Sequence, residues 1–471
     1  MFRWKEGKPE DRDIPQIAVD ELEWLFERRG VRVHGYMLLS GDTILREKYF
    51  GDYHKDSLHR MYSIAKTFVA LAVGLLVKDG LVTLDDRICD YFPEKLPEGG
   101  PHPWCAEMTI RDMLSMRTCH GSTTYKKYPG CDWTESFFRV TPDHVPGTVF
   151  AYDTSSSHVL GALVEKLTGK KMLDYMRENL FYELGFSKEA YMIEDPVGVS
   201  QGGSGLMCTL RDIAAAAFLC SRNGLVDGRQ LLPPDFLQEA LKNQVPTDIQ
   251  PKLDEQFGYG YFVWMPREEG FTFFGMGGQL AVCFPKYDFC YLTMADTLGF
   301  PAGLQILHDC FYQTIWPYIS ETKGGAKPKN ETEDKARFAL EAGRLRNLTQ
   351  RRTYACYPNK MGWEKLSFDW EQGILRFWIP EGEFQFRFGS EDYLRQSFLD
   401  TGYTCECMGY WKMGHFILKC FVIGEEMGNV QIDFAWKDSR LSMRAVCTPD
   451  AFKNGMEKKF QGFASAEYCN V

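Results

Sequence analysis

The chain has 471 residues, of which 44% are hydrophobic and 25% are charged, and both values are ordinary for a globular protein. This length predicts two or three domains, one of them large enough to shelter a buried site. The formal net charge of -10 comes without a basic stripe along the sequence. We therefore expect neither nucleic acid nor an anionic membrane surface as a partner.

Three features of the sequence predict a cytoplasmic protein that does not span a membrane. The first residues pass directly into charged side chains without an apolar signal core, and nowhere do about 18 apolar residues follow one another. Fifteen cysteines at scattered spacings are typical of reduced thiols rather than of a disulfide framework. Cys405 and Cys407 lie too close together for a two-plus-two zinc ligand set, so we expect no metal and no cofactor.

The first part of the chain combines strand and helix patterns. Residues 36–40 and 44–47 are typical of two strands around a tight turn at Gly41 and Asp42. Residues 64–77 place apolar side chains at helical spacing, which predicts a buried helix. Strands at both ends with helices between them predict an α+β domain. Further helices are expected at 110–117, 156–168, 210–222 and 234–242, and two more strands at 271–274 and 279–284.

A polar segment separates this domain from a different kind of sequence. Residues 321–335 are rich in Lys and Glu and contain Gly and Pro, which predicts a boundary. Beyond about residue 350 apolar and polar residues alternate, as expected for short strands of a small barrel or sandwich, with turns at 381–382 and 427–429. We therefore expect a first domain over 1–320, a linker over 321–350 and an all-β domain over 351–471.

The segment Ser63-Ile64-Ala65-Lys66 places a hydroxyl and an amine one helical turn apart, on the same face of the predicted helix. A serine needs a neighbouring base to act as a nucleophile, and a lysine serves when burial lowers its pKa. A pattern with two fixed positions also occurs by chance, and Ser320 and Lys323 repeat it in the predicted linker. The pattern alone leaves a nucleophile and an accidental spacing about equally plausible.

Five segments in the same order favour the nucleophile, because together they resemble the serine β-lactamase-like superfamily of class C β-lactamases, penicillin-binding proteins and related esterases. The resemblance covers about residues 15–315 and predicts an antiparallel sheet flanked by helices. The segments are Arg60-Met61-Tyr62-Ser63-Ile64-Ala65-Lys66-Thr67-Phe68, Leu81-Val82-Thr83-Leu84-Asp85-Asp86, Thr109-Ile110-Arg111-Asp112-Met113-Leu114, Pro146-Gly147-Thr148-Val149-Phe150-Ala151-Tyr152 and Gly202-Gly203-Ser204-Gly205-Leu206-Met207.

The resemblance implies a role for each matching residue. Ser63 is the expected nucleophile, Lys66 its base, and Tyr152 the residue that shares protons with the attacking and leaving groups. The backbone N–H groups of Ser63 and Gln279 are the expected oxyanion hole. Without the resemblance, Tyr152 would be an ordinary aromatic residue of a surface loop.

The sequence also departs from the family pattern. Where the family has Lys-Thr-Gly or His-x-Gly, this chain has Met276-Gly277-Gly278, and the family's Tyr-x-Asn becomes Tyr152-Asp153-Thr154. Thr154, Met276, Gly277 and Gly278 are thus expected to contact a substrate that lacks the carboxylate of a β-lactam. The departures resemble the branch of esterases and 6-aminohexanoate-oligomer hydrolases.

Other candidate residues have weaker grounds. Five aromatic residues between Cys119 and Val140 either line an acyl pocket or belong to the core, and these are Tyr125, Tyr128, Trp133, Phe137 and Phe138. His120 and His158 occupy no position that a Ser-Lys mechanism needs. The C-terminal part resembles the small lipocalin-like β domains that are sometimes appended to this superfamily.

Together these observations predict a serine hydrolase that cleaves a small ester or amide through an acyl-enzyme on Ser63, without a cofactor. The alternative from another class is a non-catalytic binding or regulatory protein on the same fold. The altered motifs support it, whereas the joint presence of Ser63, Lys66 and Tyr152 argues against it. A β-lactamase or D-Ala-type peptidase is a third, weaker alternative. Sequence does not identify the substrate, the oligomeric state or the role of the β domain.

Overall fold

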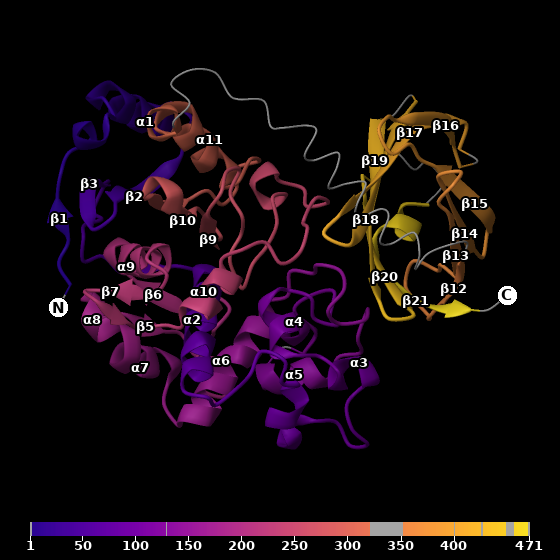
Figure 1. The fold of residues 1–471 in the computed structure, drawn as a ribbon, viewed down its shortest axis with the longest axis horizontal. Helices are drawn as coiled ribbons and strands as arrows, with labels where there is room; N and C mark the ends of the chain where they lie inside the picture. Colours follow the sequence, from indigo (N-terminus) through magenta and orange to yellow (C-terminus); the bar gives the residue numbers. More distant parts are fainter. Residues whose placement is uncertain are drawn as a thin grey trace.

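The computed structural model describes residues 2–128, 130–320, 352–399, 401–424, 427–448 and 456–469. They form two bodies that lie next to each other, a larger one around a mixed sheet and a smaller barrel (Figure 1). The expected α+β domain and the expected all-β domain are thus confirmed. The predicted linker 321–350, and with it Lys323 of the second Ser-x-x-Lys pattern, falls outside the described residues.

The larger body contains a six-stranded sheet in the order β1-β3-β2-β11-β10-β9. Neighbouring strands are antiparallel except for β1 and β3, which are parallel. Both predicted strand pairs are present, β2 with β3 and β9 with β10. The strands are β1 (Lys5–Glu6), β2 (Arg32–Ser40), β3 (Thr43–Tyr49), β9 (Phe271–Gly275), β10 (Gln279–Phe284) and β11 (Phe289–Asp296).

Helices cover both faces of this sheet. The helices α1 (Gln16–Arg28) and α11 (Gln305–Thr314) pack against one face through a core that includes Leu22, Val282 and Phe311. On the opposite face lie α2 (Ile64–Lys78) and α9 (Leu210–Ser221), in a second core (Figure 1). Thirteen of the fifteen residues of α2 are buried. The predicted helix 64–77 is therefore both present and buried.

Most of the remaining helices of the larger body surround α2 or lie toward the barrel, whereas the last one packs beside α11 on the other face of the sheet. The helix expected at 110–117 ends earlier, at Leu114, because Met116 has a left-handed backbone with φ of 55°. The helix expected at 156–168 begins at Thr154, where the Asp153 carboxylate caps it by accepting from the N–H of Ser155. These helices are α3 (Pro103–Ala106), α4 (Ile110–Leu114), α5 (Trp133–Arg139), α6 (Thr154–Thr168), α7 (Met172–Met176), α8 (Tyr182–Leu184), α10 (Pro234–Ala240) and α12 (Trp316–Ile319).

Two small sheets complete the larger body. One of them, in the order β4-β6-β5, pairs the segment just before Ser63 with residues that follow Gly205. This pairing fixes the chain that leads into α2. The strands are β4 (His59–Arg60), β5 (Tyr191–Met192), β6 (Leu206–Cys208), β7 (Leu225–Val226) and β8 (Arg229–Gln230).

The smaller body is an antiparallel, nearly closed barrel of ten strands in the order β15-β14-β13-β12-β21-β20-β19-β18-β17-β16. Aromatic side chains such as Phe377, Phe386 and Phe434 fill its interior. The turn expected at 427–429 is wrong, because these residues pair with β18 and belong to β19. The strands are β12 (Thr353–Cys356), β13 (Lys365–Asp369), β14 (Ile374–Ile379), β15 (Gly382–Arg387), β16 (Leu394–Phe398), β17 (Tyr403–Lys412), β18 (His415–Ile423), β19 (Met427–Lys437), β20 (Arg440–Cys447) and β21 (Gly462–Cys469).

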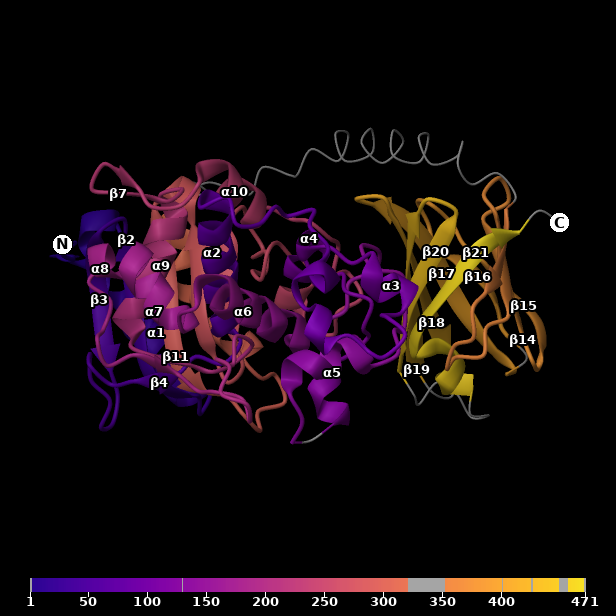
Figure 2. The same ribbon diagram turned by 90° about the horizontal axis from the view of Figure 1, so that it is seen from below.

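The barrel contacts the larger body through β19, β20 and β21, on the side of α3 to α5, and through Lys412 of β17, which bonds Asp248 at 2.7 Å (Figure 2). The N–H of Val145 donates to the hydroxyl oxygens of Ser442 and Ser465 at 3.3 and 3.2 Å. Arg440 forms an ion pair with Glu107 at 2.7 Å. None of the described helices combines the length and the apolar character that crossing a membrane would require.

Candidate active site

Ser63 lies at the N-terminal end of α2, directly before its first helical residue. The preceding residue, Tyr62, has a left-handed backbone with φ of 46°, a conformation that non-glycine residues rarely adopt and that often occurs next to functional sites. Lys66 follows one helical turn later, and its Nζ donates to Ser63 Oγ at 2.9 Å. The structure thus brings together the two residues that the sequence pattern singled out.

Lys66 is almost completely buried, although its side chain carries an amine. Its Nζ also donates to the carbonyl oxygen of Gly203 at 2.7 Å. Burial lowers the pKa of Lys66 to about 7, the carboxylate of Asp153 opposes this shift, and Lys126 adds to it. Near neutral pH the amine therefore has a free lone pair in a substantial share of molecules, as a base for Ser63 requires.

Tyr152 lies next to both Ser63 and Lys66. Lys66 Nζ is 5.0 Å from the centre of the Tyr152 ring, which stacks on Trp264 with centroids 5.8 Å apart. Burial raises the pKa of Tyr152, and a hydrogen bond with Ser63 opposes this shift in part. The tyrosine therefore remains a neutral phenol at neutral pH, a form that donates a proton rather than accepts one.

The loop that carries Tyr152 is fixed by backbone hydrogen bonds. The N–H of Gly147 donates to the carbonyl of Arg117 at 2.7 Å, and the N–H of Ala151 donates to the carbonyl of Met116 at 2.9 Å. Gly147 has φ of 75°, which favours glycine, and a Cβ there would lie 2.8 Å from a carboxylate oxygen of Asp112. The conformation of the Pro-Gly turn before Tyr152 is thus fixed by the close contact between Gly147 and Asp112.

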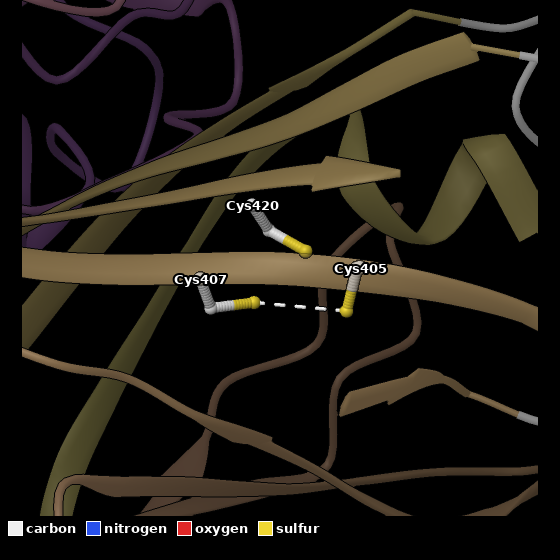
Figure 3. Close-up of side chains that lie close together, drawn as sticks. All are labelled: Cys405, Cys407 and Cys420. Atoms are coloured by element: carbon white, nitrogen blue, oxygen red, sulfur yellow. Dashed lines mark hydrogen bonds between the residues drawn. The ribbon is translucent and has the colours of Figure 1, made fainter. Parts of the chain in front are cut away.

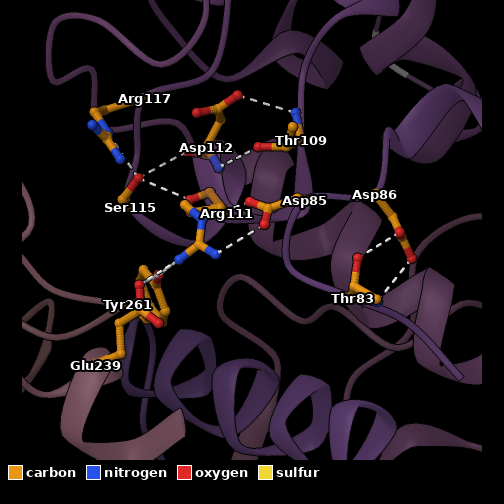
Figure 4. Close-up of polar contacts among 10 residues, drawn as sticks. All are labelled: Thr83, Asp85, Asp86, Thr109, Arg111, Asp112, Ser115, Arg117, Glu239 and Tyr261. Carbon is orange, nitrogen blue, oxygen red and sulfur yellow. Dashed lines mark hydrogen bonds and ion pairs between the residues drawn. The ribbon is translucent and has the colours of Figure 1, made fainter. Parts of the chain in front are cut away.

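A polar network holds the residues that follow α4 (Figure 4). Arg111 bonds Asp85 at 2.9 Å and the hydroxyl of Tyr261 at 2.8 Å, and it also bonds Glu239. At the end of α4, Arg117 donates to the Ser115 hydroxyl at 2.9 Å. Two of the motifs on which the resemblance rests, 81–86 and 109–114, thus belong to one hydrogen-bonded network around α4.

Thr154 lies beside Gly203, whose carbonyl oxygen accepts a hydrogen bond from Lys66. A Cβ added to Gly203 would lie 2.3 Å from the Thr154 methyl group, so the two residues are in close contact. The N–H of Thr154 donates to the Thr123 hydroxyl at 3.2 Å. Its neighbour Asp153 is buried, and burial raises the pKa of that carboxyl group. Contact of Thr154 with substrate stays a prediction.

Met276, Gly277 and Gly278 form the turn between β9 and β10. The Met276 side chain is 50% exposed, whereas both glycines are buried and have positive φ. The turn follows the edge strand β9, whose last residue, Gly275, lies so close to the segment of Ser63 that a Cβ would be 2.3 Å from the Met61 carbonyl oxygen. The three residues are thus at the end of the sheet nearest the serine segment, and their role stays a prediction.

The strand register bears on the expected oxyanion hole. Thr272 exchanges both of its backbone hydrogen bonds with Trp264, so its backbone groups face away from β10. The backbone N–H and C=O groups of successive residues in a strand point to opposite sides. The groups of Gly275 therefore point toward its partner Gln279 on β10, whereas the N–H of Met276 points toward the outer edge of the sheet. The Gln279 side chain donates to the carbonyl of Ala295 at 2.8 Å. Gln279 as an oxyanion donor stays a prediction, and Met276 is an alternative.

The aromatic segment after Cys119 divides into core and surface. Phe137 and Phe138 are buried in the core, and Tyr125 stacks on Trp133 with centroids 4.0 Å apart. Tyr128 is exposed. His120 is buried and bonds the Phe137 carbonyl at 2.8 Å, and His158 lies 3.2 Å from the carboxylate of Asp195. Both histidines thus have structural partners.

The barrel contributes one residue near Tyr152 that sequence reasoning missed. Arg444 of β20 donates to the carbonyl of Phe150 at 3.1 Å and lies 6.0 Å from the centre of the Phe150 ring. Glu255 interacts electrostatically with both Arg444 and Tyr152. No sequence pattern connects Arg444 with Phe150 or Glu255, because these residues lie far apart in the chain. In addition, Arg444 bonds a backbone carbonyl, which has no sequence signature.

A serine and a buried lysine at the start of a helix, next to the edge strand of the six-stranded sheet, are typical of a serine hydrolase of the β-lactamase type. The family model described as Beta-lactamase matches residues 27–306, well over half of the chain. The chain belongs to the beta-lactamase family.

Individual relatives are distant. The 6-aminohexanoate-dimer hydrolase of Paenarthrobacter ureafaciens is 21% identical over 222 residues, which are 44% of this chain and 56% of that protein. The chain therefore spans little more than half the length of that relative. A putative 6-aminohexanoate-dimer hydrolase from Bacillus anthracis superposes with a TM-score of 0.52 at 20% identity, over 63% of this chain and 81% of that one. EstCE1, a hydrolase with promiscuous acyltransferase activity, superposes with a TM-score of 0.51 at 14% identity, over 63% and 99%.

Proposed function

We propose that this protein hydrolyses a small ester, or an amide, through an acyl-enzyme on Ser63. The single observation that carries the proposal is the hydrogen bond of 2.9 Å between Lys66 Nζ and Ser63 Oγ, formed by an amine whose pKa burial lowers to about 7. A surface lysine would hold its proton at neutral pH and could not accept one from the serine.

The proposed reaction has two steps. Lys66 takes the proton of Ser63 as its Oγ attacks the carbonyl carbon, and Tyr152, a neutral phenol, donates a proton to the leaving oxygen or nitrogen. Water then attacks the acyl group and gives one proton to the Tyr152 phenolate, while protonated Lys66 returns its proton to Ser63 Oγ, so all three groups are restored. The backbone N–H of Ser63, together with that of Met276 or Gln279, stabilises the negative oxygen that forms in each step.

An uncharged acyl group fits the surroundings of Ser63 best. Met276 stands where the family pattern has a cation that holds a carboxylate, and its exposed thioether favours an apolar contact. The aromatic side chains of Trp264 and Tyr259 pack around Tyr152. The names of the relatives cover amide and acyl-transfer chemistry. The altered Tyr-x-Thr sequence favours an ester, because a threonine hydroxyl offers one donor on a single atom, whereas the family's asparagine amide offers two donors and a separate carbonyl acceptor.

The test is hydrolysis of short-chain p-nitrophenyl esters by the purified protein and by Ser63→Ala. Ser320→Ala is a matched control, because Ser320 belongs to the second Ser-x-x-Lys pattern. We expect hydrolysis by the wild type and by Ser320→Ala and none by Ser63→Ala. Equal rates in all three proteins would refute the role of Ser63.

Parallel substrates separate the alternatives. A p-nitroanilide and a short ω-amino-acid oligomer report amidase activity, and a chromogenic cephalosporin reports β-lactamase activity. The account expects the ester to have the highest kcat/KM, because the carboxylate-binding cation of the family is replaced by Met276. Binding of any of these compounds without turnover would favour the non-catalytic alternative.

A further inference from the structure

Three cysteine side chains converge inside the barrel, far in sequence from the proposed active site (Figure 3). Cys405 and Cys407 are two residues apart on β17 and therefore point to the same face of the strand. Cys420 on β18 is the register partner of Cys407. All three are completely buried in the barrel core. The pair at 405 and 407 alone is too small a ligand set, but the strand register supplies a third sulfur.

The sulfur atoms have the spacing of ligands around one ion. The Sγ atoms of Cys405 and Cys407 are 3.8 Å apart, and all three lie within 4.8 Å of one another. A tetrahedral zinc ion with Zn–S bonds of about 2.3 Å separates its sulfur ligands by about 3.8 Å. Small rotations of Cys420 would thus bring three sulfurs to bonding distance of a common centre.

Binding of an ion would convert the three thiols to thiolates, since a metal ion stabilises the thiolate form of each of its ligands.

The cluster lies one strand from the place where the barrel is incompletely closed. Cys405 is the register partner of Gln396 on β16, one end of the strand order, and β15 is the other end. The Gln396 side chain bonds the backbone N–H and C=O of Arg387 on β15, at 3.0 and 2.6 Å. At this point the Gln396 side chain, rather than a ladder of backbone hydrogen bonds, connects β16 to Arg387 of β15. Rotation of the Gln396 side chain would therefore open a route for an ion to the cysteine cluster.

We propose that Cys405, Cys407 and Cys420 bind one thiophilic d10 metal ion, Zn²⁺ or Cu⁺, inside the barrel. Soft thiolate ligands select these ions over Mg²⁺ or Ca²⁺. Three metal–sulfur bonds form as the three thiols release their protons to solvent, so affinity falls as pH falls. No described histidine or carboxylate joins the cluster, so a fourth ligand of zinc would be water, whereas Cu⁺ is satisfied by three sulfurs.

The experiment is an anaerobic titration of the reduced, metal-free full-length protein with Zn²⁺ and, separately, Cu⁺, each in competition with a chromophoric chelator. We expect one ion per chain for at least one metal, and which of the two binds tighter identifies the ion. The Cys405→Ala/Cys407→Ala double variant should bind at least about 100-fold more weakly. Cys356→Ala is the matched control, a barrel cysteine outside the cluster, and should bind as the wild type does.

A second measurement covers the case in which the double variant does not fold. X-ray absorption of the metal-loaded wild type should show a first shell of sulfur atoms at about 2.3 Å. A shell of nitrogen and oxygen alone would overturn the proposal. Equal affinity of the wild type and a folded double variant would overturn it as well, as would a disulfide between Cys407 and Cys420 in protein isolated from cells, seen as a mass lower by two hydrogens.

Discussion

The two domains differ in how they bury ionisable groups. The larger domain buries Lys66 and Asp153 next to its proposed nucleophile, and the surrounding protein shifts their pKa values in the direction of the neutral forms. The core of the barrel is made of aromatic and aliphatic side chains and three thiols, and its buried His415 and Asp433 bond each other at 2.8 Å. Its Arg444 donates to the carbonyl of Phe150 in the other domain. We therefore propose proton transfer for the first domain and support of its Tyr152 loop for the second.

Removal of the proposed nucleophile gives the largest expected effect. Ser63→Ala should lower kcat for a p-nitrophenyl ester by at least about 1000-fold, because no other group then forms the acyl-enzyme. The melting temperature should change little, since Ser63 lies at the end of a helix rather than in its core. Steady-state kinetics and thermal unfolding of the same preparations measure both. Wild-type activity in Ser63→Ala would contradict the proposal that the reaction takes place in this domain.

Loss of the phenol should have a smaller effect. Tyr152→Phe keeps the ring on Trp264 and removes only the proton donor, so we expect kcat to fall about 100-fold. An ester with a better leaving group needs less protonation and should lose less. Equal losses for good and poor leaving groups would show that Tyr152 acts through packing alone.

The pKa of Lys66 predicts the pH dependence. Below a pH of about 7 the amine is protonated and cannot accept the serine proton, so kcat/KM should fall about tenfold per pH unit. Above that pH the amine is free and the rate should reach a plateau. A profile of kcat/KM between pH 5 and 9, with buffers of constant ionic strength, measures this. A flat profile across pH 7 would contradict the assignment of Lys66 as the base.

The contact from the barrel should have the smallest effect. Arg444→Met removes the hydrogen bond to the Phe150 carbonyl, two residues before Tyr152, and should lower kcat about tenfold with little change in KM. Arg440→Met is the matched control at the same interface, because it breaks the ion pair with Glu107 without touching the Tyr152 loop. Equal losses of kcat in both variants would show that the barrel acts only through its general contact with the larger domain and not through Arg444.

The sequence predicted those parts of the site that depend on local spacing or on motif order. The proximity of Ser63 and Lys66 follows from helical periodicity, whereas their choice as candidate residues, like that of Tyr152, follows from the order of the family segments. The contribution of Gly203 could not be predicted, because it acts through a backbone carbonyl. Arg444 and Cys420 were missed because their partners depend on domain contact and on strand register.

The fold was predicted where periodicity and turn signals agree. The buried α2 and the hairpin of β2 and β3 are examples. The turn expected at 427–429 failed because Gly428 and Asn429, although typical turn residues, pair with Val422 and Phe421 of β18. Similarly, the left-handed backbone of Met116 ended α4 earlier than its apolar pattern predicts.

The central claim, a covalent intermediate on Ser63, is tested most directly by intact-protein and peptide mass spectrometry after rapid acid quenching of the protein with a p-nitrophenyl ester. The account predicts a mass increase of one acyl group, located on the peptide that contains Ser63 and absent from Ser63→Ala. An acyl group on another residue, or turnover of the ester with no acylated protein at any quench time, would contradict it.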